Sequence, residues 1–153
     1  MNAKKIFLLI IFIISLTSLK SYSQDRGLGL GVMIGEPTGF SGKYWLNKEH
    51  ALDFGLAYSF VHSSSAFSLH GDYLIHLPDL IKAEYRLPVY YGFGARIHTS
   101  KNGNALGARG VVGIVWMYNY LPIDIFIELA PVFNLFPETS LQLDFAIGGR
   151  YYL

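Results

Sequence analysis

Bulky apolar residues and small or polar residues alternate along most of this sequence with a period of two. The clearest stretch is 52–60, where Leu, Phe and Tyr occupy the even positions and Asp, Gly, Ala and Ser the odd ones. Successive side chains of a β-strand point to opposite faces, so the alternation predicts strands with one apolar face. Eight such strands are expected, over residues 26–35, 40–46, 52–60, 67–76, 89–98, 108–118, 123–133 and 141–153.

Most connections between these strands are short and carry turn residues. Pro and Gly within 36–39, and Asn-Gly within 100–105, are typical of tight turns and hairpin loops. The last loop is expected over 135–140. The longest connection is 77–87, where Pro78-Asp79 favours one helical turn. Successive strands joined by short turns predict an all-β antiparallel meander.

The size of the side chains on the two faces of the strands predicts which face lies on the outside of the barrel. The interior of an eight-stranded barrel is just wide enough for side chains to fill it. The apolar face is crowded with Phe, Tyr, Trp, Leu and Ile, whereas the polar face is rich in Gly, Ala and Ser and carries a single lysine, Lys43. The small face therefore fits the interior, and the sequence predicts an eight-stranded antiparallel up-and-down transmembrane β-barrel.

Composition agrees with a membrane barrel. Charged residues make up 15% of the chain and aromatic residues 16%, and the mean hydropathy is +0.33. After residue 23, no stretch approaches the ~20 apolar residues of a membrane-spanning helix. Every backbone group in hydrocarbon must be paired within the protein, which a closed barrel achieves.

Aromatic residues of the apolar face gather toward the strand ends. Two aromatic girdles flanking an aliphatic band are a feature of membrane barrels. If Leu153 is periplasmic, the girdle toward the periplasm consists of Tyr44, Tyr73, Tyr91, Trp116, Tyr118 and Tyr151, and the girdle at the other rim of Phe40, Tyr58, Phe60, Phe67 and Phe133.

The N-terminal segment 1–23 is predicted to be a signal peptide. Lys4 and Lys5 are followed by an apolar run at 6–14, and Ser21-Tyr22-Ser23 offers small residues for cleavage before Gln24. A retained anchor helix is the alternative. The sequence has no cysteine, which excludes an acylated lipoprotein, a disulfide framework and a thiolate metal site.

The barrel domain is predicted over 24–153. Cleavage removes three of the twelve basic residues, so nine basic and eleven acidic residues remain, with a formal net charge of −2. No basic patch indicates nucleic acid. We expect a monomer with both ends in the periplasm.

The last expected strand ends in a pattern formed by Gly148, Tyr151 and Leu153. This G-x-x-Y-x-L resembles the C-terminal signal by which the assembly machinery recognises outer-membrane barrels, with Leu153 in place of the usual Phe. The whole of 24–153 resembles the small barrels of the OmpX and OmpA membrane-domain type. The stretches GEPTGFSGKYWL (35–46) and LPVYYGFGARI (87–97) resemble a family of uncharacterised outer-membrane barrels of diderm bacteria.

That resemblance implies location in the outer membrane of the Gram-negative envelope. It implies outer-membrane lipids, including lipopolysaccharide, and the barrel-assembly machinery as partners. It implies no activity, cofactor or catalytic residue.

The strand positions that carry small and polar residues also carry a set of charged residues, which are therefore expected in the interior of the barrel. Because buried charges must be paired, we expect a closed network rather than an ion pathway. Arg109 is expected to meet Glu128, and Arg150 to meet Asp124. The network consists of Lys43, Asp53, Asp72, Arg96, Arg109, Asp124, Glu128, Asp144 and Arg150, with His70, His76 and His98 on the same face. A narrow ion-conducting pore is the alternative.

Two H-x-S pairs leave an enzymatic alternative open. Barrel hydrolases that deacylate lipid A use a His and a Ser two apart on a lipid-facing strand, with a carboxylate. Here the pairs are His62 with Ser64 and His98 with Ser100, at strand ends or in loops. The histidines show no H-E-x-x-H spacing, so no metal site is predicted. We expect a structural or surface-interaction role.

Trp45 is bulky for the inward face. It either closes the periplasmic mouth of the barrel or marks a bulge that shifts the register after Lys43.

Overall fold

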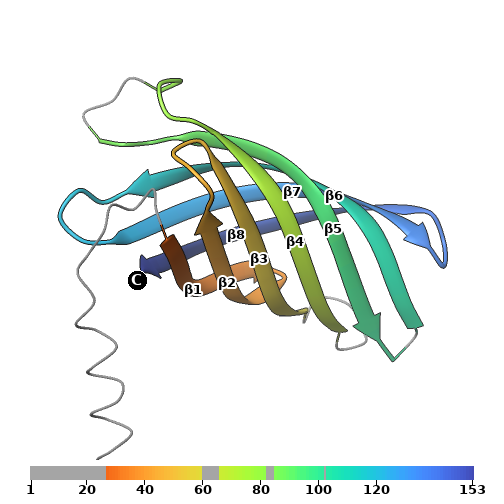
Figure 1. Cartoon of the computed structure of the whole chain (residues 1–153). Helices are drawn as coiled ribbons and strands as arrows, with labels where there is room; N and C mark the ends of the chain where they lie inside the picture. Colours follow the sequence, from red (N-terminus) through yellow and green to blue (C-terminus); the bar gives the residue numbers. More distant parts are fainter. Residues whose placement is uncertain (1–26, 60–65, 82–84, 102) are drawn as a thin grey trace, which may run out of the picture.

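The computed structural model describes residues 27–59, 66–81, 85–101 and 103–153. Eight strands form one antiparallel sheet that closes into a barrel, with neighbours in chain order (Figure 1). The predicted eight-stranded up-and-down barrel is confirmed. The strands are β1 Gly27–Glu36, β2 Thr38–Trp45, β3 His50–Ser59, β4 Ala66–Leu77, β5 Val89–Ser100, β6 Gly103–Met117, β7 Ile123–Phe136 and β8 Ser140–Tyr152.

The last strand closes the barrel against the first. β1 pairs with β8 from Gly29 opposite Tyr152 to Glu36 opposite Phe145. The end of the barrel that holds the start of β1 and the end of β8 also holds the connections 46–49, 78–88 and 118–122; we call it the terminal end. The opposite end is the far end.

The two sides of the barrel differ in length. β6 has 15 residues and β7 has 14, whereas β2 has 8. As a result, the hairpins β5–β6 and β7–β8 extend past β1–β3 at the far end, on the right of Figure 1.

The turns are tighter than the sequence predicted. β2 begins at Thr38, not at residue 40, because the Thr38 side chain closes the turn: its Oγ1 accepts from Gly35 N at 3.1 Å and donates to Gly35 O at 2.9 Å. β5 continues to Ser100 and β6 begins at Gly103, so the expected loop over 100–105 is mostly strand. β7 likewise runs to Phe136.

The longest connection, 78–88, has a single turn at Pro78-Asp79, where Leu80 N donates to Leu77 O at 3.5 Å, and its described part contains no helix. Beyond the turn, the chain runs beside β6: Val115 N donates to Pro88 O and Met117 N to Arg86 O, both at 3.0 Å. Among the described residues, no helix is both long enough and apolar enough to cross a membrane.

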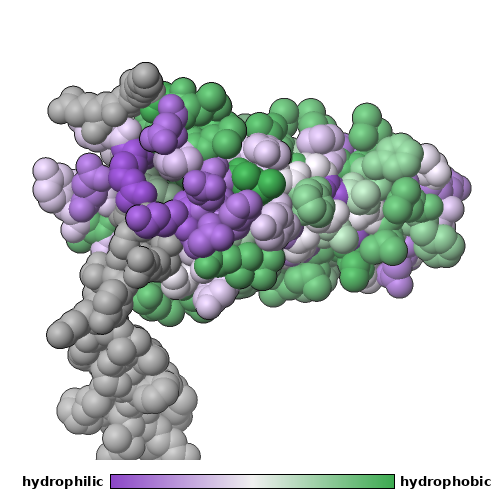
Figure 2. All heavy atoms as spheres, turned by 45° about the horizontal axis from the view of Figure 1, so that its top comes forward, coloured by the Kyte–Doolittle hydropathy of each residue, from purple (hydrophilic) through white to green (hydrophobic). Residues whose placement is uncertain are grey.

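The two faces of the sheet lie as predicted: the small and polar side chains point into the barrel, and the bulky apolar side chains point outward. Trp45 is 4% exposed and lies in the interior, while β2 keeps an unbroken register with β3 from Thr38 to Trp45, so no bulge follows Lys43. The outer face is covered by apolar side chains, which Figure 2 shows along the barrel wall, with hydrophilic residues gathered chiefly at the terminal end.

Candidate functional site

All nine charged residues predicted to face inward are buried. Each is at most 5% exposed: Lys43, Asp53, Asp72, Arg96, Arg109, Asp124, Glu128, Asp144 and Arg150. They come from seven of the eight strands, so their contacts depend on the closed barrel. They form three arginine-centred groups and one lysine cluster.

Arg150 on β8 is the most connected of these residues. Its Nε donates to Ser41 Oγ at 2.8 Å, and its Nη2 donates to Asp53 Oδ1 at 2.7 Å. Nη1 lies 3.5 Å from Asp124 Oδ2, on the residue directly opposite in β7. The guanidinium also lies over the Phe126 ring, with Cζ 3.9 Å from its centroid. One side chain thereby links β2, β3, β7 and β8.

Arg109 on β6 binds two carboxylates from opposite directions. Its Nη2 donates to Glu128 Oε1 at 2.5 Å, and its Nη1 is paired with Asp72 Oδ2. The other Glu128 oxygen accepts from the Tyr90 hydroxyl at 2.9 Å. Breaking a buried pair leaves an uncompensated charge, so losing either partner would destabilise the barrel even where the net contribution of the intact pair is small.

Arg96 on β5 reaches across the barrel to β8. Its Nη1 lies 2.8 and 2.9 Å from the two oxygens of Asp144, and its Nη2 donates to Gln142 Oε1. These two strands are not neighbours in the sheet, so the contact crosses the interior.

Lys43 is held by aromatic rings and a histidine. Its Nζ lies 4.9 Å from the Tyr90 ring centroid, 5.3 Å from that of Trp45 and 3.2 Å from His76 Nε2. An ammonium group only donates, so His76 Nε2 accepts and its Nδ1 carries the proton, which it donates to Glu49 O at 3.2 Å. The Trp45 and His76 rings pack at an angle of 44°, with their centroids 4.3 Å apart. These residues fill the interior next to the terminal-end connection 46–49.

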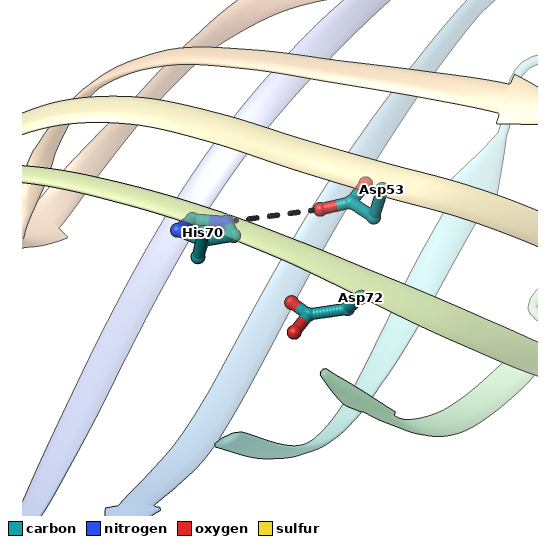
Figure 3. A group of neighbouring side chains, drawn as sticks. All are labelled: Asp53, His70 and Asp72. Atoms are coloured by element: carbon teal, nitrogen blue, oxygen red, sulfur yellow. Dashed lines mark ion pairs between the residues drawn. The ribbon is translucent and has the colours of Figure 1, made fainter. Parts of the chain in front are cut away.

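A second histidine lies beside two of the buried carboxylates. Asp53 on β3 is directly opposite Asp72 on β4, and His70 is two residues before Asp72 (Figure 3). His70 Nε2 lies 4.0 Å from Asp53 Oδ2. One ligand atom from each of the three residues lies within 4.8 Å of the others. The expectation of no metal site rested on spacing along the chain, which does not reveal a group assembled across two strands.

An open polar pocket of about 430 Å³ lies at the far end, between the β5–β6 and β7–β8 hairpins. His98, Ser100 and Glu138 are among its lining residues. The Ser100 hydroxyl donates to Gly103 O at 3.2 Å. His98 has the inward parity of β5, unlike the lipid-facing histidine of the hydrolases considered above. His62 of the other H-x-S pair lies outside the described residues.

The residues of the expected assembly signal lie on β8 and just after it. Tyr151 and Leu153 point outward, each 47% exposed, and Gly148 lies on the inner parity against Phe126. A Cβ at Gly148 would lie 2.5 Å from Phe126 Cζ and from Val32 O, so this position has no room for a side chain.

Comparison with known proteins assigns the chain to no family: no protein-family model matches its sequence, and no curated protein is significantly similar to it. The class that the fold defines is the closed eight-stranded antiparallel β-barrel with a charged interior.

Proposed function

We propose that this chain is an integral outer-membrane β-barrel protein, monomeric, with a closed interior and a structural or surface-interaction role. The observation that carries the proposal is the distribution of charge. Among the described residues, every exposed charged side chain lies in a connection between strands: Lys48, Glu49, Asp79, Arg86, Lys101 and Glu138. The outer face of the strands is apolar.

The exposed apolar side chains run around the whole barrel. An uninterrupted wall of this size in water would be far larger than the few hundred Å² of apolar patch that soluble monomers expose. A hydrocarbon environment removes that penalty. The wall includes Leu30, Val32, Phe40, Leu52, Phe54, Leu56, Leu69, Phe93, Ile97, Val112, Ile114, Ile125, Ile127, Leu129, Phe145 and Ile147.

Aromatic rings near the terminal end fit a membrane interface. Trp116 contacts Tyr85 and Tyr118 edge-on, with ring centroids 6.2 and 5.9 Å away. Amphipathic rings at this level are favoured where hydrocarbon meets head groups. Contact with outer-membrane lipids, lipopolysaccharide included, follows from the proposed location.

The proposal predicts the fate of a charge placed on the outer face. Tyr151→Asp should slow insertion, because it replaces an aromatic ring of the expected assembly signal with a charge, which near the interface costs up to about 1 kcal/mol. The matched control is Tyr120→Asp, which makes the same change in a connection at a residue 86% exposed. Membrane fractionation and heat-modifiable gel mobility measure the outcome.

Wild type and Tyr120→Asp should be found in the outer-membrane fraction and shift mobility on heating, whereas Tyr151→Asp should be depleted there. Wild-type protein in the soluble periplasmic fraction would contradict the membrane proposal. If Tyr151→Asp reaches the outer-membrane fraction at the wild-type level and shifts its gel mobility on heating as wild type does, then Tyr151 does not face lipid as proposed.

The filled interior predicts that the barrel does not conduct. The arginine groups and the Lys43 cluster occupy the lumen with paired charges and packed rings, and an eight-stranded barrel has little further space. Purified protein in a planar bilayer should show no steady conductance. A stable, ion-selective open channel would favour the narrow-pore alternative instead.

A further inference from the structure

The group formed by Asp53, His70 and Asp72 has ligand atoms that the arginine network leaves unused. Arg150 binds Asp53 through Oδ1, so Oδ2 is the oxygen that faces His70. Arg109 binds Asp72 through Oδ2, and Asp72 Oδ1 is buried with no hydrogen-bond partner among the described residues. Each carboxylate thus keeps one oxygen for a further partner.

His70 is similarly unsatisfied. It is 3% exposed, its Nδ1 has no hydrogen-bond partner in the described part of the chain, and its Nε2 comes no closer than 4.0 Å to Asp53 Oδ2. Burying a polar group without a hydrogen bond costs free energy, and such groups in native structures call for an explanation. Figure 3 shows both carboxylates pointing to the side on which the His70 ring lies.

The charges around this group favour a cation. Asp53 and Asp72 are directly opposite on neighbouring strands, an arrangement in which like charges repel. The nine buried charged residues comprise four cations and five carboxylates, so their formal charge is −1.

We propose that Asp53, His70 and Asp72 form a binding site for one divalent cation of the zinc type. One imidazole with two carboxylates is a donor set suited to borderline ions such as Zn²⁺, rather than to Mg²⁺ or Ca²⁺, which prefer oxygen alone. Zinc bonds of about 2.0–2.2 Å place tetrahedral ligands ~3.3 Å apart, so the three ligand atoms, now up to 4.8 Å apart, need to converge by up to about 1.5 Å. A water molecule would supply the fourth ligand.

Arg109 and Arg150 keep their places in this site. Carboxylates that ligate metals are commonly held by hydrogen bonds from a second ring of residues, which fix their orientation. The arginines bind Asp53 Oδ1 and Asp72 Oδ2, which leaves Asp53 Oδ2 and Asp72 Oδ1 for the metal. The cation relieves the repulsion between Asp53 and Asp72, and it binds His70 through Nε2, the nitrogen that faces Asp53.

The test is zinc content of the full chain, purified in detergent from cells grown with zinc and dialysed against a weak chelator. Elemental mass spectrometry should find roughly one zinc per wild-type chain. His70→Gln should retain less than about a tenth of that. The matched control is His76→Gln, another buried histidine of β4, whose partners are Lys43 and Glu49; it should retain the wild-type amount.

Circular dichroism checks that each variant keeps its strand content. If His70→Gln does not fold, Asp72→Asn serves as the second variant, because it removes the charge of a ligand while keeping its shape. Wild-type protein without zinc, or equal zinc in wild type and in the folded ligand variant, would overturn the proposal.

Discussion

Replacing Arg150 with methionine is expected to lower the free energy of unfolding by about 3–5 kcal/mol, because it leaves buried carboxylates without their cation. The Arg150 side chain is fully buried and binds Asp53 and Asp124, which are themselves 3% and 0% exposed. Tyr152 still donates to Asp124 at 2.6 Å, but a hydroxyl does not replace a charge. Methionine fills most of the space over Phe126, so the loss is chiefly electrostatic.

The control for Arg150→Met is Lys48→Met, which removes a positive charge from the exposed connection between β2 and β3. An exposed charge contributes little, so unfolding should shift by no more than about 0.5 kcal/mol. Urea titrations followed by gel mobility or tryptophan fluorescence compare the two. Equal stability of Arg150→Met and Lys48→Met would show that the buried pairs do not matter for stability.

A double variant separates charge from packing. Adding Asp53→Asn to Arg150→Met removes one of the stranded carboxylates, so part of the lost stability should return. Residues in one ion-pair network show coupling of about 0.5–3 kcal/mol in such cycles. Strict additivity of the two changes would mean that Arg150 acts through its other contacts, with Asp124, Ser41 and Phe126.

The sequence was sufficient for the fold because the period-two pattern reports directly on which way a side chain faces. It placed Trp45 and Lys43 on the inner parity, and both are buried. The period-two pattern was less informative for the turns. Gly39 and Gly103 were expected in loops but lie within β2 and β6. Glycine occurs in both turns and strands, so its presence does not mark where a strand ends.

Partners within the barrel could be predicted only where the strands are adjacent. Arg109 with Glu128 and Arg150 with Asp124 join neighbouring strands, and both expected pairs are present. Arg96 with Asp144 and Arg150 with Asp53 cross the interior, so they depend on how the sheet closes. The Asp53–His70–Asp72 group was missed because it depends on the register between β3 and β4, which alternation alone does not determine.

A single methyl group at the closing seam is expected to destabilise the barrel. Gly31 of β1 lies opposite Arg150 of β8, and a Cβ at Gly31 would lie 2.7 Å from the Arg150 Cα and would also collide with the carbonyl of Gly149. Backbone cannot rotate aside as a side chain can, so Gly31→Ala must push β1 and β8 apart. Overpacking of this kind costs about 1–3 kcal/mol.

The matched control is Gly71→Ala, in the middle of β4, where an added Cβ meets nothing within 4 Å. It should leave stability unchanged or raise it by up to about 1 kcal/mol, because alanine loses less backbone entropy on folding than glycine.

Displacement of β8 at Gly31 also moves the backbone that carries Arg150, so Gly31→Ala should weaken the contacts of Arg150 with Ser41 and Asp53. Combining Gly31→Ala with Arg150→Met should therefore cost less than the sum of the two changes. Equal unfolding midpoints for Gly31→Ala and Gly71→Ala would contradict the close approach of β1 and β8. If the losses of stability from Gly31→Ala and Arg150→Met simply add in the double variant, the contact between β1 and β8 and the interior charges are independent.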